Sequence, residues 1–199
     1  MNSSRRAHRP AQWETFEHVS APIDWPGARA EVAHDCAAAV LRAGRTGQQP
    51  AAAAVGLADS VGLDELADLW RDAAPSSLPG VLWSLYVLRA WCRSAPAEVT
   101  RLYAAGRHWQ PVDEVVAGVA DPPGPVEIVQ TAESVLTGVF TGDFAVALER
   151  AAAFHRIVAA GRAQVMGDEA GQARLAEGNL RAAGQMAGAA AAWRAGSLE

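Results

Sequence analysis

Residues 77–93 have the sequence SLPGVLWSLYVLRAWCR, which is apolar on almost every side when it is wound into a helix. Past its first residue, the polar side chains are Ser84, Arg89 and Arg93. A helix that is apolar all round is buried by neighbours on several sides. The segment is also shorter than the roughly 20 apolar residues that span a bilayer. We therefore predict a central core helix at residues 77–93 and no membrane span.

The segments on both sides of this helix show apolar residues at helical spacing. Residues 28–43, 50–57 and 63–72 precede it, and three further segments begin at Pro96, Pro111 and Pro125, where proline suits the first helical turn. Thr141 is expected to cap the helix that ends at Gly161. The chain is therefore predicted to be all-α, a single-domain bundle of about seven helices, with those from 96 to 162 packed around residues 77–93.

The segment after Pro111 is rich in valine and allows two interpretations. Val112, Val115, Val116 and Val119 are β-branched and would also suit a strand. Their i, i+3, i+4, i+7 spacing places them on one face of a helix. We favour the helix.

Four predicted helices end in similar short sequences, each of which leads to a glycine. The glycines are Gly44, Gly106, Gly161 and Gly184. We interpret them as helix ends at which glycine adopts a left-handed conformation. Their unequal spacing argues against a solenoid repeat.

The two ends of the chain differ from its middle. Residues 1–26 are expected to form an irregular arm held to the core by its aromatic side chains, and residues 27–166 the helical domain. Residues 167–197 are predicted to form an Ala/Gly-rich C-terminal helix, which docks on this chain or on a second copy, or frays. We interpret residues 198–199 as the remnant of an affinity tag.

The composition excludes several chemistries, because the chain has 17 arginines and no lysine. Schiff-base catalysis, a phosphate-binding loop of the usual lysine type and a kinase site all require that lysine. Cys36 and Cys92 lack metal-ligand spacing and are interpreted as buried thiols of a cytoplasmic protein. Glu31 and His34 form a single E-x-x-H pair, which we interpret as a surface ion pair. We expect no metal site and no cofactor.

Residues 113–149 contain seven acidic side chains and no arginine. One interpretation is that these acids stabilise helix N-termini. The other is a surface for a basic protein partner, or for a second copy. The net charge of −5 argues against nucleic acid as a partner.

Arginine and aromatic residues alternate between positions 83 and 109, as they do in sites for anionic or aromatic ligands. The candidate ligand-binding residues are Arg89, Arg93, Arg107, His108 and Trp109, with His155 added because it shares the inward face of its helix with Phe144 and Leu148. The competing interpretation is that these arginines pair with nearby acids and the aromatic side chains fill the core. No catalytic residue is predicted.

Two functions follow from these patterns. The first is a non-enzymatic helical interaction or regulatory protein, with a homodimer formed through the C-terminal helix. The second is a small-molecule binding protein or enzyme whose pocket is lined by the Arg, Trp and His residues above. Whether Arg89, Arg107, His108 and His155 point into one cleft discriminates between them.

Overall fold

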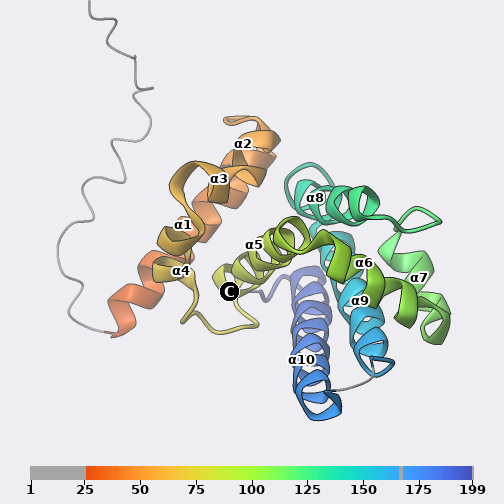
Figure 1. Ribbon diagram of the computed structural model, residues 1–199. Coiled ribbons are helices and arrows are strands. Elements are labelled where there is room, and N and C mark those ends of the chain that lie inside the picture. The colour runs from red at the N-terminus through yellow and green to blue at the C-terminus, as the bar shows by residue number, and fades with distance from the viewer. Residues whose placement is uncertain (1–25, 166–167, 199) are drawn as a thin grey trace, which may run out of the picture.

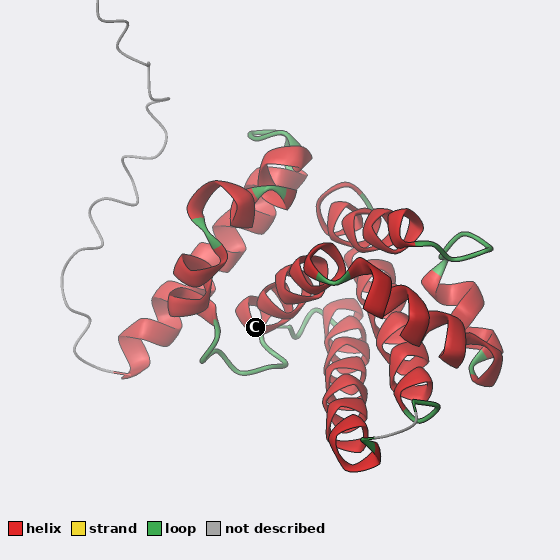
Figure 2. Cartoon of the chain, in the orientation of Figure 1, coloured by secondary structure: helices red, strands yellow, loops and turns green. Residues whose placement is uncertain are grey.

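The computed structural model describes residues 26–165 and 168–198, which fold into helices without any strand in those ranges (Figures 1 and 2). The all-α prediction is confirmed. The elements are α1 (Pro26–Arg45), α2 (Ala51–Val55), α3 (Leu57–Val61), α4 (Leu63–Trp70), α5 (Leu78–Ser94), α6 (Pro96–Gly106), the 3-10 helix η1 (Arg107–Trp109), α7 (Pro111–Ala117), α8 (Pro125–Thr141), α9 (Phe144–Arg162) and α10 (Glu169–Arg194).

The helix count exceeds the predicted seven because the chain is broken into short helices after α1. Gly56 separates α2 from α3, and Gly62, with a φ of 103°, separates α3 from α4. Sequence periodicity did not indicate α3. The predicted N-terminal arm lies outside the described residues, apart from Pro26, at which α1 begins.

Helix α5 is buried on several sides, as its apolar sequence predicts. It packs against α1 and α4 on one side and against α6, α8 and α10 on the other. Ser77 caps its start by accepting a hydrogen bond from the Gly80 N–H at 3.4 Å. The Tyr86 hydroxyl donates to the Ala54 carbonyl, and the Trp70 indole N–H donates to the Ala33 carbonyl at 3.2 Å. The first bond attaches α2 to α5, and the second attaches α4 to α1.

Helix α9 is a second central helix. It packs against α6, α7, α8 and α10, and most of its residues are buried. Its cap is Asp143, whose Oδ1 accepts from the Ala145 N–H at 2.8 Å and the Val146 N–H at 3.2 Å. The prediction of Thr141 as this cap is wrong, because Thr141 ends α8 and its hydroxyl donates to the Thr137 carbonyl at 3.0 Å.

Two glycines set the contact between α6 and α9. A Cβ on Gly106 would collide with the Ile157 carbonyl oxygen, and a Cβ on Gly161 would collide with the Leu102 carbonyl oxygen. The helices therefore meet backbone to backbone. The left-handed role predicted for the four helix-end glycines is wrong, since the described glycines with positive φ are Gly47, Gly62, Gly118 and Gly196.

Helix α10 docks on α9 of the same chain (Figure 1). Docking on this chain was one of the alternatives predicted for residues 167–197. Ala183, Met186 and Ala190 are buried in the contact. Near its end the Trp193 ring lies 4.6 Å from the Phe144 ring, between centroids, and the Arg45 guanidinium lies 5.9 Å from the Trp193 centroid. Leu198, interpreted as tag, packs on the core, and Glu199 lies outside the described residues.

None of the helices described is both long enough and apolar enough to cross a membrane.

Candidate functional site

Arg89 and Arg93, the first two candidate ligand-binding residues, share two carboxylates. Arg89 Nη2 lies 2.8 Å from Asp59 Oδ2 and 3.4 Å from Glu133 Oε1, and Arg93 Nη1 lies 3.0 Å from Asp59 Oδ2. The hydrogen bond from Arg89 holds the pKa of Asp59 below its usual value. Two guanidinium groups thus face two carboxylates. This cluster, between α3, α5 and α8, has no excess positive charge with which to bind an anion.

Arg107 lies in a second cluster. Its Nη1 donates to the Asp121 carboxylate and lies 3.3 Å from Glu114 Oε1. The next two candidates, His108 and Trp109, follow it on η1 and are exposed, Trp109 to 64%. Here too the arginine charge is matched by acids of the same chain.

His155, the sixth candidate, is buried in a third cluster between α9 and α10. Arg162 Nε donates to Asn179 Oδ1 at 3.1 Å, and Asn179 Nδ2 lies 2.9 Å from His155 Nδ1. Since a guanidinium can only donate, the asparagine oxygen must face Arg162 and its NH₂ must face the histidine. His155 Nδ1 is then an acceptor, which assigns the neutral imidazole with its proton on Nε2. Burial lowers the pKa of His155 to about 4, in agreement with this assignment.

The structure therefore brings Arg89 and Arg93 together, keeps Arg107, His108 and Trp109 adjacent along the chain, and places His155 elsewhere. The three clusters have no member in common. The charge matching and the buried histidine follow the competing interpretation of these residues, in which arginines pair with acids. A shared ligand pocket stays a prediction.

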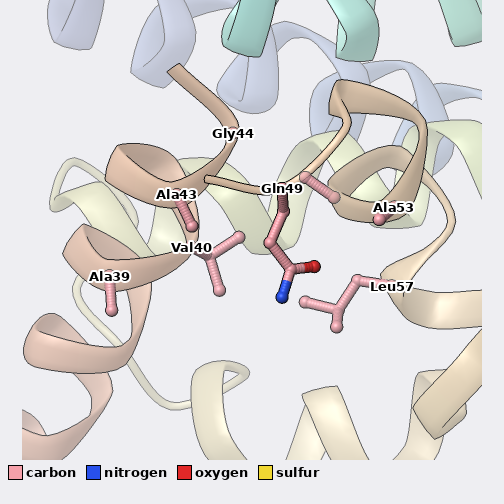
Figure 3. Close-up of a pocket in the computed structure, with 8 residues that line it drawn as sticks. Ala39, Val40, Ala43, Gly44, Gln49, Ala53 and Leu57 are labelled. Carbon is pink, nitrogen blue, oxygen red and sulfur yellow. The ribbon is translucent and has the colours of Figure 1, made fainter. Parts of the chain in front are cut away.

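An apolar hollow lies between α1, α2 and α3, and has a volume of about 150 Å³ (Figure 3). We call it the α1–α3 hollow. Its walls are uncharged, and Gln49 points its side-chain amide into it. The lining residues are Ala39, Val40, Ala43, Gly44, Gln49, Ala53, Ala54 and Leu57. None of the six candidate ligand-binding residues is among them, so sequence analysis did not indicate this feature.

Helix α7 turns its polar side inward. Its buried residues are Asp113 and Ala117, and Arg156 of α9 donates to the Asp113 carboxylate from Nε at 2.8 Å and from Nη2 at 2.6 Å. Arg150 of α9 donates to the Ala117 carbonyl at 3.3 Å. One ion pair and a charged hydrogen bond to the last turn therefore hold α7 on α9, together with the buried Ala117. In most helices larger apolar side chains make this contact.

The opposite face of α7 is apolar and exposed. Val112 is 76% exposed and Val115 is 81% exposed, and Val116 beside them is also exposed. We define the η1–α7 ridge as Trp109, Val112, Val115 and Val116. The helix prediction for this segment is confirmed for Val112, Val115 and Val116, which share an outward face. The placement of Val119 on the same helix face is wrong, because α7 ends at Ala117 and Val119 packs on the core. Asp113 and Glu114, between the valines, were the available signal that a second, polar face competes for burial.

The seven acids of residues 113–149 are largely occupied within the chain. Five form ion pairs with arginines of the same chain, namely Asp113, Glu114, Asp121, Glu133 and Glu149. Asp143 caps α9, and Glu127 lies in the first turn of α8. The helix-terminus interpretation holds for Asp113, Glu114, Glu127 and Asp143. No separate acidic surface is needed to explain the stretch.

The two cysteines are free thiols. Cys92 is buried as predicted, whereas the prediction for Cys36 is wrong, since that side chain is half-buried. Burial raises the pKa of the Cys92 thiol to about 12, so it stays protonated and unreactive. Within residues 26–165 and 168–198, no three His, Cys, Asp or Glu side chains are grouped as they are in a metal site.

The fold and its surfaces define an all-α helical protein with an outward apolar ridge at one place and an apolar hollow at another. Neither a family model nor a curated protein nor a solved structure matches the chain.

Proposed function

We propose that this protein acts by binding another protein chain, without catalysis, and that the η1–α7 ridge is the binding surface. The observation that carries the proposal is the inverted polarity of α7, which buries Asp113 and exposes Val112 and Val115. Contiguous exposed apolar surface of this kind is typical of protein–protein interfaces. A partner that covers the ridge removes this surface from water.

The composition of the ridge fits an interface better than a ligand pocket. Trp109 is a large exposed aromatic side chain, and tryptophan is enriched among the residues that dominate binding energy. Complete burial of a valine contributes on the order of 1.5 kcal/mol or more. Both acids of α7 are paired with arginines of the same chain, so a partner needs no charge to match them. The ridge thus favours an uncharged apolar surface on its partner.

A homodimer through the C-terminal helix stays a prediction. The inner face of α10 is occupied by α9, which leaves Leu175, Leu180, Gly184 and Gly188 on the outer face. That face also carries the exposed pair Glu177 and Arg181. A basic partner at residues 113–149 has less support, since those acids are mostly paired. The η1–α7 ridge is the stronger candidate because it is more exposed and carries no charge.

Site-specific photo-cross-linking in the cell that naturally produces the protein tests this function. Val115 is replaced by photoreactive benzoylphenylalanine, and Leu180, a half-exposed leucine on α10, is replaced likewise as the matched control. We expect a discrete adduct of defined mass from position 115 and at least tenfold less adduct from position 180. Adding Val112→Glu to the first variant should remove the adduct.

Equal adduct yields at the two positions, or an adduct at position 115 that survives Val112→Glu, would show that the ridge is not a specific binding surface.

A further inference from the structure

We propose that the partner of the η1–α7 ridge is the α1–α3 hollow of a second copy of this chain, so that copies join head to tail. This inference rests on the proposed function, because it names the partner of the same ridge. Two independent features carry it, one convex and one concave. The valines Val112 and Val115 of the ridge are exposed, and the lining of the hollow is uncharged.

The ridge and the hollow of one molecule cannot meet each other. Helix α7 lies at one side of the molecule and α1 to α3 lie at the opposite side (Figure 1). Helices α5, α8 and α9 lie between them, since α5 packs on both α1 and α8, and α9 packs on both α8 and α7. A contact between ridge and hollow therefore requires two molecules.

The size of the hollow suits a side chain of the ridge. Val112 and Val115 are 76% and 81% exposed, so both side chains are free to enter a cavity of another molecule. Stable interfaces pack as closely as protein interiors. A cavity of about 150 Å³ holds a group of benzene size, which is large enough for a valine side chain. The hollow therefore accepts a side chain of the ridge.

The two surfaces also match in charge. All residues that line the hollow are uncharged, and both acids on α7 are already paired with arginines of their own chain. Their contact therefore buries no unpaired charge, which would be costly. Gln49 presents an amide in the hollow, and its carbonyl oxygen can accept the indole N–H of Trp109, the side-chain donor of the ridge.

Head-to-tail contacts have a distinctive consequence for the mass of the assembly. An isologous contact stops at a dimer, whereas a heterologous contact leaves a free ridge at one end and a free hollow at the other. The average mass of the full-length protein should thus rise steadily with concentration. Sedimentation equilibrium measures this directly.

A complementation experiment tests the pairing with full-length protein. Val115→Glu disables the ridge and leaves the hollow intact, while Ala53→Trp fills the hollow and leaves the ridge intact. Both positions are exposed, so neither change disturbs the core. Each variant alone should associate at least tenfold more weakly than the wild-type protein. An equimolar mixture should form a one-to-one complex that grows no further, because only one functional ridge and one functional hollow remain.

Matched controls identify the surfaces involved. Ala52→Trp adds the same side chain at an exposed position beside the hollow, and Leu180→Glu adds the same charge on α10. Both should associate as the wild-type protein does. Circular dichroism checks that every variant is folded.

Three outcomes would overturn the inference. If Val115→Glu dissociates the protein and Ala53→Trp does not, the ridge of one molecule binds the ridge of the second molecule. If Leu180→Glu alone dissociates it, the contact is α10. If the wild-type protein is monomeric up to millimolar concentration while cross-linking at position 115 yields an adduct of other than twice the chain mass, the ridge binds a different protein. In that last case the proposed function stands and the head-to-tail pairing fails.

Discussion

His155 shows what a single buried residue contributes to this structure. Its helical position predicts an inward side chain beside Phe144 and Leu148, and the structure confirms that it is buried. Its partner Asn179 lies on another helix, and Arg162 sets the orientation of that asparagine. Arg162 donates a hydrogen bond to Asn179, and Asn179 donates one to His155 Nδ1, which therefore acts as an acceptor. This arrangement stabilises the neutral form and is better suited to structure than to acid–base chemistry near neutral pH.

The pH dependence of stability should reveal this histidine. The unfolded chain binds a proton at His155 near pH 6.5, whereas the folded chain does so near pH 4. The unfolded state therefore binds more protons between these values, and the free energy of unfolding falls as the pH falls through this window. Between pH 7 and 5.5 we expect His155 to account for a loss of about 1 kcal/mol.

Urea unfolding at a series of pH values, on the wild-type protein and on His155→Gln, checks this expectation. The variant should lose about 1 kcal/mol less over the same interval, because the other histidines titrate equally in both proteins. Parallel pH profiles would mean that the folded protein protonates His155 at its ordinary pKa.

Helices α6, α7 and α9 show at the scale of elements how one pattern serves different roles. Gly106 and Gly161 occur in short sequences that are typical of helix ends. In the structure they instead allow the backbones of α6 and α9 to touch. The valines of α7 have the spacing of a buried face, yet they face outward because Asp113 and Ala117 face α9. Spacing establishes which residues share a face. The neighbouring helix decides whether that face is buried.

Glycine-to-alanine substitutions separate contact glycines from open ones. Gly106→Ala and Gly161→Ala should each lower the free energy of unfolding by about 2 kcal/mol, because the new methyl group collides with a carbonyl oxygen of the facing helix. Gly184→Ala and Gly188→Ala, in open space on α10, should raise it by up to about 1 kcal/mol through helix propensity. Chemical denaturation of the four variants measures these changes. A small effect at Gly106 and Gly161 would contradict the close crossing.

The described helices form two groups that meet at α5 and also at α8, on which α1 and α2 pack directly. Helices α1 and α4 pack on one part of α5, and α6, α8 and α10 pack on another. The side chains that join them are among the most buried in the described chain, including Leu82 and Tyr86. Because both groups share this helix, neither should unfold without affecting the other.

Unfolding should therefore be a single cooperative transition. Leu82→Ala should lower the free energy of unfolding by roughly 3 kcal/mol, since it leaves a cavity in the shared core. Val87→Ala, on the same helix but 40% exposed, should cost clearly less. Far-UV ellipticity and tryptophan fluorescence should shift together in both variants. Separate midpoints for the two signals would mean that the groups unfold independently.

Local sequence accounts for most of the secondary structure and for little of the candidate site. The prolines at 96, 111 and 125 begin α6, α7 and α8 as predicted, because their role depends only on the first turn of the helix. The ridge and the hollow could not be predicted in this way. The hollow forms between α1, α2 and α3, and its lining combines residues from all three helices with Gln49 from a loop.

Chemistry and periodicity along the chain were sufficient to establish an all-α fold, a buried helix at residues 77–93 and the exclusion of lysine-dependent mechanisms. Pairing between distant residues was decided by the tertiary structure alone. The tertiary structure pairs Arg89 with Asp59 and Glu133, Arg156 with Asp113, and His155 with Asn179. A helical pattern depends on neighbours within a turn or two, whereas an ion pair depends on where two helices meet. The direction in which α7 faces also depends on where helices meet. The tertiary structure alone therefore decided it, and the proposed function rests on it.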